Sequence, residues 1–391
     1  MDIAISLPTF EAEALRQIAA GALPGVAGMV ANEHDVLYRG AFGVGDIDTG
    51  RPLRADDVFF IASMTKAITS LACAQLIEQA RVGLEDDAAA LVPSMVAKVL
   101  TGFDANGQPI LREPRRKVTV RHLLTHTSGQ TTDIWNASTI RYIKAMKLPP
   151  VPGCMTEAFR TPLVFDPGEG WEYGVGLDWV GQIVERVSGL TLNDYFKTHI
   201  FEPIGMTETS FILSEAQKAR LIPIAMRQPD GSFRATGFQV SQTPEFFMGG
   251  AGLYGTIMDY IRFLQMLLNN GMAQGGRVLK PETVELFFAN HIGDMEWPGL
   301  QTAIPSMSAD VSLFPGVPKR WSLGFMRNET DIPGHRRAGS GFWAGLANSY
   351  FWVDRTSKLC GVTASGYFPF ADKAALEVFD GLERDAYATF G

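Results

Sequence analysis

The chain has 391 residues, of which 46% are hydrophobic, and a formal net charge of −8 at pH 7. This length allows two or three compact units or one large divided domain. The acidic balance gives no reason to expect a nucleic-acid partner, and the one basic cluster, Arg115 to Lys117, is interpreted as a solvated loop.

The first half of the chain predicts two strands between two helices, followed by a long helical region. Residues 10–25 have the pattern of an amphipathic helix, and residues 26–46 alternate as two strands joined by a polar turn. Residues 63–83 form the clearest helix, with Ser63 at its start and Gly83 as its stop. From about residue 85 to residue 240 the pattern is mostly helical pieces broken by Pro and Gly.

The C-terminal part again combines helices and strands. Helices are predicted over residues 256–271, 281–289 and 371–390, and strands over 321–327, 348–354 and 358–366. Because strands and helices occupy both ends, we predict one α/β domain built from residues 1–85 and 241–391. Residues 86–240 are then a mainly helical inserted domain.

Cysteine usage and the absence of long apolar runs bear on the compartment. Three cysteines, far apart and odd in number, do not fit a disulfide framework. The N-terminus has no basic region followed by an apolar run, and no stretch is apolar enough to span a bilayer. We therefore expect a reduced, cytoplasmic protein without a membrane partner.

Ser63 and Lys66 lie three residues apart at the start of a predicted helix. Residues at this spacing share a helix face, so the lysine amine can reach the serine hydroxyl. A serine needs a base to become a good nucleophile, and a lysine can serve when its pKa is lowered. The alternative is a helix-capping serine beside a solvated lysine. The apolar segments on both sides, VFFIAS and AITSLA, favour a buried lysine.

Tyr173 follows a Pro-Gly turn and precedes the amphipathic helix pattern within FDPGEGWEYGVGLDWVGQIVERVSG. A loop tyrosine at a helix start can point its hydroxyl into a cleft. It can act there as a general base when a neighbouring ammonium lowers its pKa. An ordinary core tyrosine is the alternative.

Together these segments resemble a known family, the serine β-lactamase-like hydrolases of the penicillin-binding-protein fold. The resemblance covers about residues 10–385 and is closest to the family VIII carboxylesterases. It implies an α+β fold in which an antiparallel sheet is flanked by helices and carries an inserted all-helical domain. The matching segments are DVFFIASMTK, VTVRHLLTHTSG, FDPGEGWEYG, GGAGLYGTIMDYIRFL and SGFWAGLANSYFWVD.

The resemblance also implies roles for individual residues. Ser63 matches the acylated nucleophile, Lys66 its proton-handling partner, and Tyr173 the general base that later protonates the leaving group. Which of Lys66 and Tyr173 takes the first proton stays open. The backbone amides of Ser63 and Leu346 match the two halves of the oxyanion hole.

Two motifs depart from the lactamase and peptidase pattern. Tyr173-Gly174-Val175 stands where those enzymes have Tyr-x-Asn, and Trp343-Ala344-Gly345 stands where they have Lys-Thr-Gly or His-x-Gly. The groups that hold an amide side chain and a carboxylate are thus missing. We expect Val175, Trp343, Ala344 and Gly345 to line an apolar pocket for neutral esters.

Other motifs support neither a cofactor nor a metal. GAGLYG (250–255) matches a dinucleotide-binding turn but follows a poor strand. His122 and His126 are spaced like a helical metal pair, yet no third ligand is evident. No Gly-x-Ser-x-Gly occurs for a Ser-His-Asp triad.

The sequence therefore predicts a serine carboxylesterase acting on small to medium neutral esters through an acyl-enzyme on Ser63. An acyltransferase of the same fold and a β-lactamase or DD-peptidase are the alternatives within the family. A non-enzymatic binding relative is the alternative outside enzymes, disfavoured because Ser63, Lys66 and Tyr173 are all present.

Overall fold

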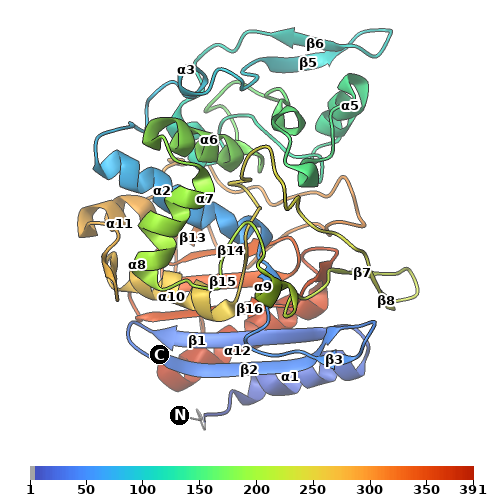
Figure 1. Cartoon of the computed structure of the whole chain (residues 1–391), viewed down its shortest axis with the longest axis vertical. Coiled ribbons are helices and arrows are strands. Elements are labelled where there is room, and N and C mark those ends of the chain that lie inside the picture. Colours follow the sequence, from blue (N-terminus) through green and yellow to red (C-terminus); the bar gives the residue numbers. More distant parts are fainter. Residues whose placement is uncertain (1–4) are drawn as a thin grey trace.

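The computed structural model describes residues 5–391, which are built around one eight-stranded sheet (Figure 1). Every neighbouring pair in the sheet is antiparallel. The two ends of the chain meet where β1 pairs with β16, with Met29 opposite Val362. In spatial order the strands are β12 (Lys319–Trp321), β13 (Met326–Asn328), β14 (Gly341–Gly345), β15 (Ser349–Asp354), β16 (Leu359–Ala364), β1 (Gly25–Asn32), β2 (Val36–Asp46) and β3 (Arg51–Pro52).

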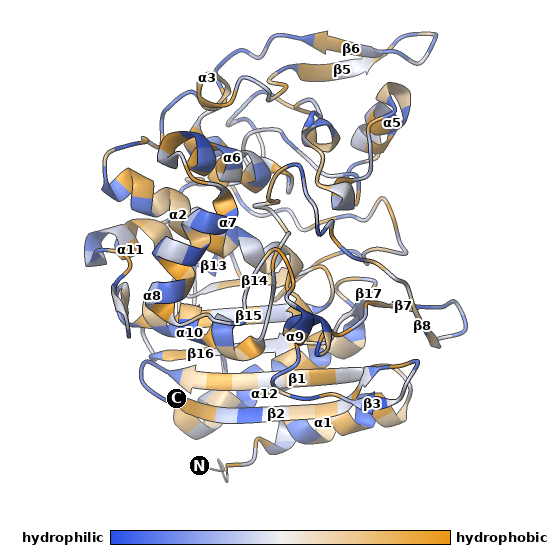
Figure 2. Cartoon of the chain, viewed as in Figure 1, coloured by the Kyte–Doolittle hydropathy of each residue, from blue (hydrophilic) through white to orange (hydrophobic). Residues whose placement is uncertain are grey.

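Helices cover both faces of this sheet. The terminal helices α1 (Pro8–Ala19) and α12 (Lys373–Phe390) pack together on one face, where Phe10 contacts the strand at Gly28. On the other face lie α10 (Ile257–Leu268), α11 (Pro281–Phe288) and α2 (Thr65–Glu78). In Figure 2, β1 is mainly apolar while β2 mixes apolar and polar residues. This contrast fits the nearly complete burial of β1.

The helix α2 is the structural centre of the molecule. Almost all of its residues are buried, because α11 packs against one side and α6 (Gly176–Ser188) against another. A helix that is apolar all round is stable only in such an environment. The N-terminal end of α2 is therefore held firmly from several directions, which suits it to carry a precisely placed side chain.

Most of the chain between α2 and α10 is helical, as predicted, but it also contains short strands. The helices are α3 (Ala88–Leu91), α4 (Val120–Leu124), α5 (Ala137–Met146), α6, α7 (Leu192–Phe196), α8 (Glu202–Ile204) and α9 (Glu215–Lys218). The strands β5 (Val99–Phe103) and β6 (Pro109–Arg112) form a hairpin. A second hairpin, β7 (Ala225–Arg227) and β8 (Phe233–Ala235), joins β17 (Tyr367–Phe368). The inserted region is thus not all-helical, and the domain boundaries at residues 85 and 240 stay a prediction.

Two further short pairs complete the described chain. The strand β4 (Phe59–Phe60), just before Ser63, pairs with β9 (Tyr254–Gly255), and β10 (Met272–Ala273) pairs with β11 (Gly276–Arg277). Within residues 5–391, no helix has both the length and the apolar character that crossing a bilayer requires.

Candidate active site

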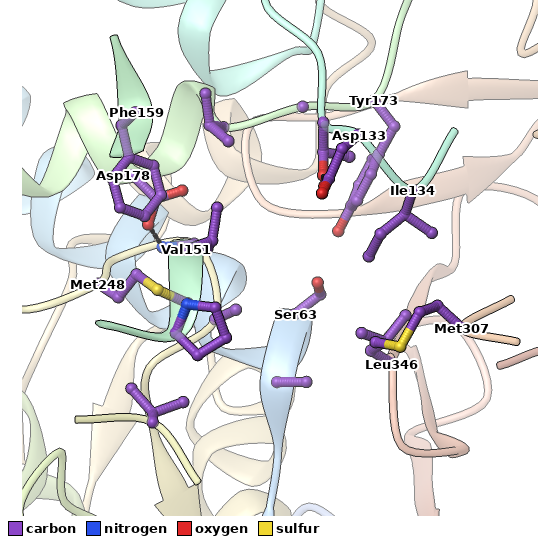
Figure 3. A pocket seen from close by; sticks show the side chains of 18 of the residues that line it. Ser63, Asp133, Ile134, Val151, Phe159, Tyr173, Asp178, Met248, Met307 and Leu346 are labelled. Carbon is purple, nitrogen blue, oxygen red and sulfur yellow. Dashed lines mark hydrogen bonds between the residues drawn. The ribbon is translucent and has the colours of Figure 1, made fainter. Parts of the chain in front are cut away.

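Ser63 lies in a tight turn that leads directly into α2. The turn, η1 (Ala62–Met64), is a 3-10 helix, and Ala62 has a φ of +46°, which alanine rarely adopts. In this first helical turn the backbone N–H of Ser63 has no intrahelical acceptor. Neither η1 nor α2 has a side-chain cap, so Ser63 does not act as a capping serine. Its hydroxyl instead points into a cavity (Figure 3).

Lys66 is buried beside this hydroxyl, with 6% of its surface exposed. Its Nζ donates to Ser63 Oγ at 3.2 Å and to the carbonyl oxygen of Gly250 at 2.7 Å. The same Nζ lies 4.7 Å from the centroid of the Tyr173 ring, in cation–π geometry. The alternative of a solvated lysine is therefore excluded.

Tyr173 comes from the loop before α6 and meets Ser63 and Lys66 at the cavity. Its Oη accepts a hydrogen bond from Trp343 Nε1 at 2.9 Å. The ring belongs to an aromatic cluster that consists of His126, Trp135, Trp171, Tyr173, Trp321 and Trp343. Gly174 allows the loop to run this close, because a Cβ there would overlap the backbone of Gln130.

The two histidines of the HLLTHTSG segment have separate structural partners. The ring of His126 stacks on Tyr173 with centroids 4.4 Å apart, and its Nδ1 accepts from Gly174 N at 3.3 Å. Burial, together with the Lys66 ammonium, lowers the pKa of His126 well below its ordinary value. His122 instead accepts from the backbone N–H of Thr119 in the capping box of α4. In the part of the chain that the structure describes, no three His, Cys, Asp or Glu side chains gather as a metal site.

The end of β14 packs directly against the chain before Ser63. A Cβ on Gly345 would overlap both the carbonyl oxygen of Ile61 and Ser349 Oγ, so glycine is needed at this contact. Leu346 follows Gly345 and lines the cavity, where Figure 3 shows its side chain. This close approach places Leu346 at the same cavity as Ser63.

Of the four residues expected to line an ester pocket, only Val175 lines the cavity. Trp343, Ala344 and Gly345 are buried and are not among the lining residues, and Trp343 is 3% exposed. The indole of Trp343 is engaged with the Tyr173 hydroxyl instead. Direct substrate contact by Trp343, Ala344 and Gly345 stays a prediction, and the polar contact that the structure shows for Trp343 is its hydrogen bond to Tyr173.

The cavity has a volume of about 290 Å³ and a mainly apolar wall (Figure 3). Lys66 is the one cation among its lining residues within positions 5–391, and Asp133 and Asp178 are the acids. The apolar side chains include Phe60, Ile134, Trp135, Val151, Phe159, Val175, Phe238, Val240, Met248, Ile304, Met307 and Leu346. Such a wall suits the hydrocarbon parts of an uncharged substrate.

Asp178 is a site residue that the sequence analysis missed. It lies in the first turn of α6 and accepts a hydrogen bond from Gly250 N at 2.9 Å. Gly250 starts the GAGLYG segment, so that glycine-rich stretch passes the cavity and ends in β9, beside the strand before Ser63. The sequence feature that could have indicated Asp178 is its place as a lone acid in the apolar run GLDWVGQIV, five residues after Tyr173.

Comparison with known proteins gives consistent relatives. The Beta-lactamase family model matches residues 12–380. Lovastatin esterase from Penicillium rubens is 32% identical over 351 residues, which cover 87% of this chain and 85% of the relative. Acyltransferase calJ from Penicillium decumbens is 30% identical over 352 residues, covering 87% and 82% of the two chains.

The solved structures agree with the predicted fold. Simvastatin synthase (LovD) from Aspergillus terreus superimposes with a TM-score of 0.83 at 26% identity, covering 99% of both chains. EstCE1, a hydrolase with promiscuous acyltransferase activity, superimposes with a TM-score of 0.75 at 19% identity, covering 96% of this chain and 98% of EstCE1. The latter likeness concerns the fold alone. The predicted fold is thus confirmed, and the chain is an enzyme that belongs to the beta-lactamase family of serine hydrolases and acyltransferases.

Proposed function

We propose that this protein is a serine carboxylesterase that hydrolyses small to medium neutral esters through an acyl-enzyme on Ser63. The observation that carries the proposal is the buried Lys66 Nζ, 3.2 Å from Ser63 Oγ at the wall of an apolar cavity. The similarity to lovastatin esterase over most of the chain supports ester hydrolysis. We further propose that the protein acts in the cytoplasm.

In the proposed reaction, Ser63 Oγ attacks the ester carbonyl and the backbone amides of Ser63 and Leu346 hold the oxyanion. The proton of Ser63 passes to the Lys66 and Tyr173 pair and then to the leaving alcohol. Trp343 donates to Tyr173 Oη at 2.9 Å and Lys66 Nζ lies 4.7 Å from the centroid of the Tyr173 ring, so both groups hold the phenol in place for proton transfer. Water then attacks the acyl-enzyme with the proton transfers reversed.

The cavity supports neutral esters over β-lactams and peptides. Val175 and Trp343 stand where an amide clamp and a cation would select those substrates, and the wall is apolar. An anionic substrate would be repelled by Asp133 and Asp178. The one lysine at the cavity, Lys66, already donates to the carbonyl of Gly250.

An acyltransferase is the second candidate. It is favoured by similarity to several transferases, including monacolin J acid methylbutanoyltransferase from Aspergillus terreus, which is 30% identical over 361 residues. The chemistry at Ser63 is the same in both cases, and an alcohol takes the place of water in the second step.

The test combines ester turnover with covalent labelling. Ser63→Ala should abolish hydrolysis of p-nitrophenyl butyrate and labelling by a fluorophosphonate. Ser70→Ala is the matched control, because Ser70 is a buried serine further along the same helix and does not line the cavity. Intact-protein mass spectrometry should find the acyl group on Ser63.

Several outcomes would contradict the proposal. Undiminished turnover by Ser63→Ala would remove Ser63 as nucleophile, and a lack of turnover by the unaltered protein would favour a binding protein. Fast nitrocefin cleavage with negligible ester hydrolysis would identify a lactamase. A new ester that forms faster than free acid when an alcohol is added would identify a transferase.

A further inference from the structure

Asp178 is a buried acid at the cavity that the proposed reaction scheme leaves unused. Only 4% of its surface is exposed, and its Oδ1 accepts from the backbone N–H of Gly250 at 2.9 Å. The approach is so close that a Cβ on Gly250 would overlap the Asp178 carboxylate. Figure 3 shows Asp178 on the opposite side of Ser63 from Leu346.

The peptide at Gly250 connects Asp178 to Lys66. The Gly250 N–H donates to Asp178, while the Gly250 carbonyl accepts from Lys66 Nζ at 2.7 Å. The preceding carbonyl, that of Gly249, accepts from Thr69 Oγ1 on α2 at 2.6 Å. The segment that holds the lysine is therefore fixed on one side by α2 and on the other by Asp178.

Two titratable groups face Asp178. Lys66 faces it from α2, and the Cys154 thiol faces it from the chain before α6. Burial raises the pKa of Asp178 to about 6, although Lys66 opposes the shift. Burial and Asp178 together raise the pKa of Cys154 to about 12, and that of His126, beyond Lys66, is lowered well below its ordinary value. With a pKa of about 6 for Asp178 and about 12 for Cys154, the thiol stays protonated over the range in which Asp178 titrates.

We propose that Asp178 is a positioning residue for acyl transfer. Its carboxylate fixes the Gly250 peptide, whose carbonyl accepts from Lys66 Nζ, and places a negative charge near the Lys66 amine beside Ser63 and Tyr173. The inference rests on the proposed function, since it requires acylation of Ser63. It assigns two separable contributions to one side chain, the hydrogen bond to Gly250 and the negative charge.

Two variants separate these contributions. Asp178→Asn retains an oxygen that accepts from Gly250 N but has no charge, and Asp178→Ala has neither. We expect kcat/KM for p-nitrophenyl butyrate at pH 8 to fall about tenfold in Asp178→Asn. In Asp178→Ala, where Lys66 also loses its alignment, the fall should be about 100-fold.

The pH profile provides a readout that a purely structural role would not change. In the unaltered protein, kcat/KM should decline below an inflection near pH 6 as Asp178 takes up its proton. Asp178→Asn should lack this inflection and stay close to the low-pH rate throughout. Asp259→Asn is the matched control. Asp259 is also buried in the first turn of a helix, α10, and accepts from a backbone N–H, that of Glu208, at 2.7 Å.

The inference fails if Asp178→Asn keeps the rate and the profile of the unaltered protein, or if Asp259→Asn loses as much activity. Should Asp178→Asn not fold, the rate of fluorophosphonate labelling of the unaltered protein between pH 5 and 8 decides instead, and a flat profile overturns the inference. Labelling without ester turnover would count against the esterase proposal alone, because labelling rates still compare the Asp178 variants. A protein that is never labelled would remove both proposals.

Discussion

Replacing Trp343 by phenylalanine tests whether the indole positions Tyr173 or contacts the substrate. The variant removes the N–H that donates to Tyr173 Oη at 2.9 Å and leaves an aromatic ring in a buried place. A hydrogen bond to a charged group contributes about 1.5–3 kcal/mol. If the Tyr173 oxygen becomes negative during acylation, the loss corresponds to a rate constant of acylation that is lower by roughly 10- to 150-fold. KM should change little, because Trp343 does not line the cavity.

The measurement is the burst of p-nitrophenol in stopped-flow experiments, which reports acylation directly. Trp321→Phe is the control, because Trp321 is buried in the same aromatic cluster, with its ring centroid 6.2 Å from that of Tyr173. Within residues 5–391, Trp321 forms no hydrogen bond with Tyr173. A raised KM with an unchanged rate constant of acylation in Trp343→Phe would refute the positioning role and favour direct contact with the ester. Equal losses in the two variants would assign the effect to packing.

Two further changes probe the surroundings of Ser63. Gly345→Ala should lower the rate of fluorophosphonate labelling of Ser63 by at least about tenfold, because the added Cβ overlaps Ile61 O and displaces Leu346. An unchanged labelling rate would show that the strand can shift without cost. Asp178→Asn should raise the melting temperature at pH 8 but not at pH 4. The folded carboxyl has a pKa of about 6, above its ordinary 3.8, so the unaltered protein loses roughly 2–3 kcal/mol of stability as the pH rises through this range. Equal melting temperatures at pH 8 would contradict that sign.

The central part of the site could be predicted because its sequence signals are local. Ser63 and Lys66 share one helical turn, so their spacing alone brings the amine to the hydroxyl. Tyr173 is far away in sequence, and its place beside them was predicted through the ordered motifs of the family. The strand and helix patterns at the two ends of the chain predicted one domain assembled from both ends, and β1 indeed pairs with β16.

The direction of Trp343 could not be predicted from the same information. In a strand, neighbouring side chains point to opposite faces. An error of one residue in placing the motif on the strand therefore moves a side chain from the face that meets the cavity to the opposite face. All five residues of β14 are buried, and the alternation of polar and apolar residues that would reveal the face is therefore missing. The hairpin of β5 and β6 was missed for a related reason, since its short strands are mostly half-buried and show no clear alternation.

The two proton carriers of the proposed reaction are held from different sides by groups outside the apolar wall. Trp343 on β14 fixes the Tyr173 oxygen, and Asp178 on α6 fixes Lys66 through the Gly250 peptide. In a cavity with few polar groups, each of these contacts is strong because little water screens it. The apolar side chains that meet the acyl and alcohol groups can then vary without disturbing proton transfer. In the proposed scheme the same groups around Ser63 serve either water or an alcohol as acyl acceptor, so we expect the side chains of the cavity wall to decide between the two.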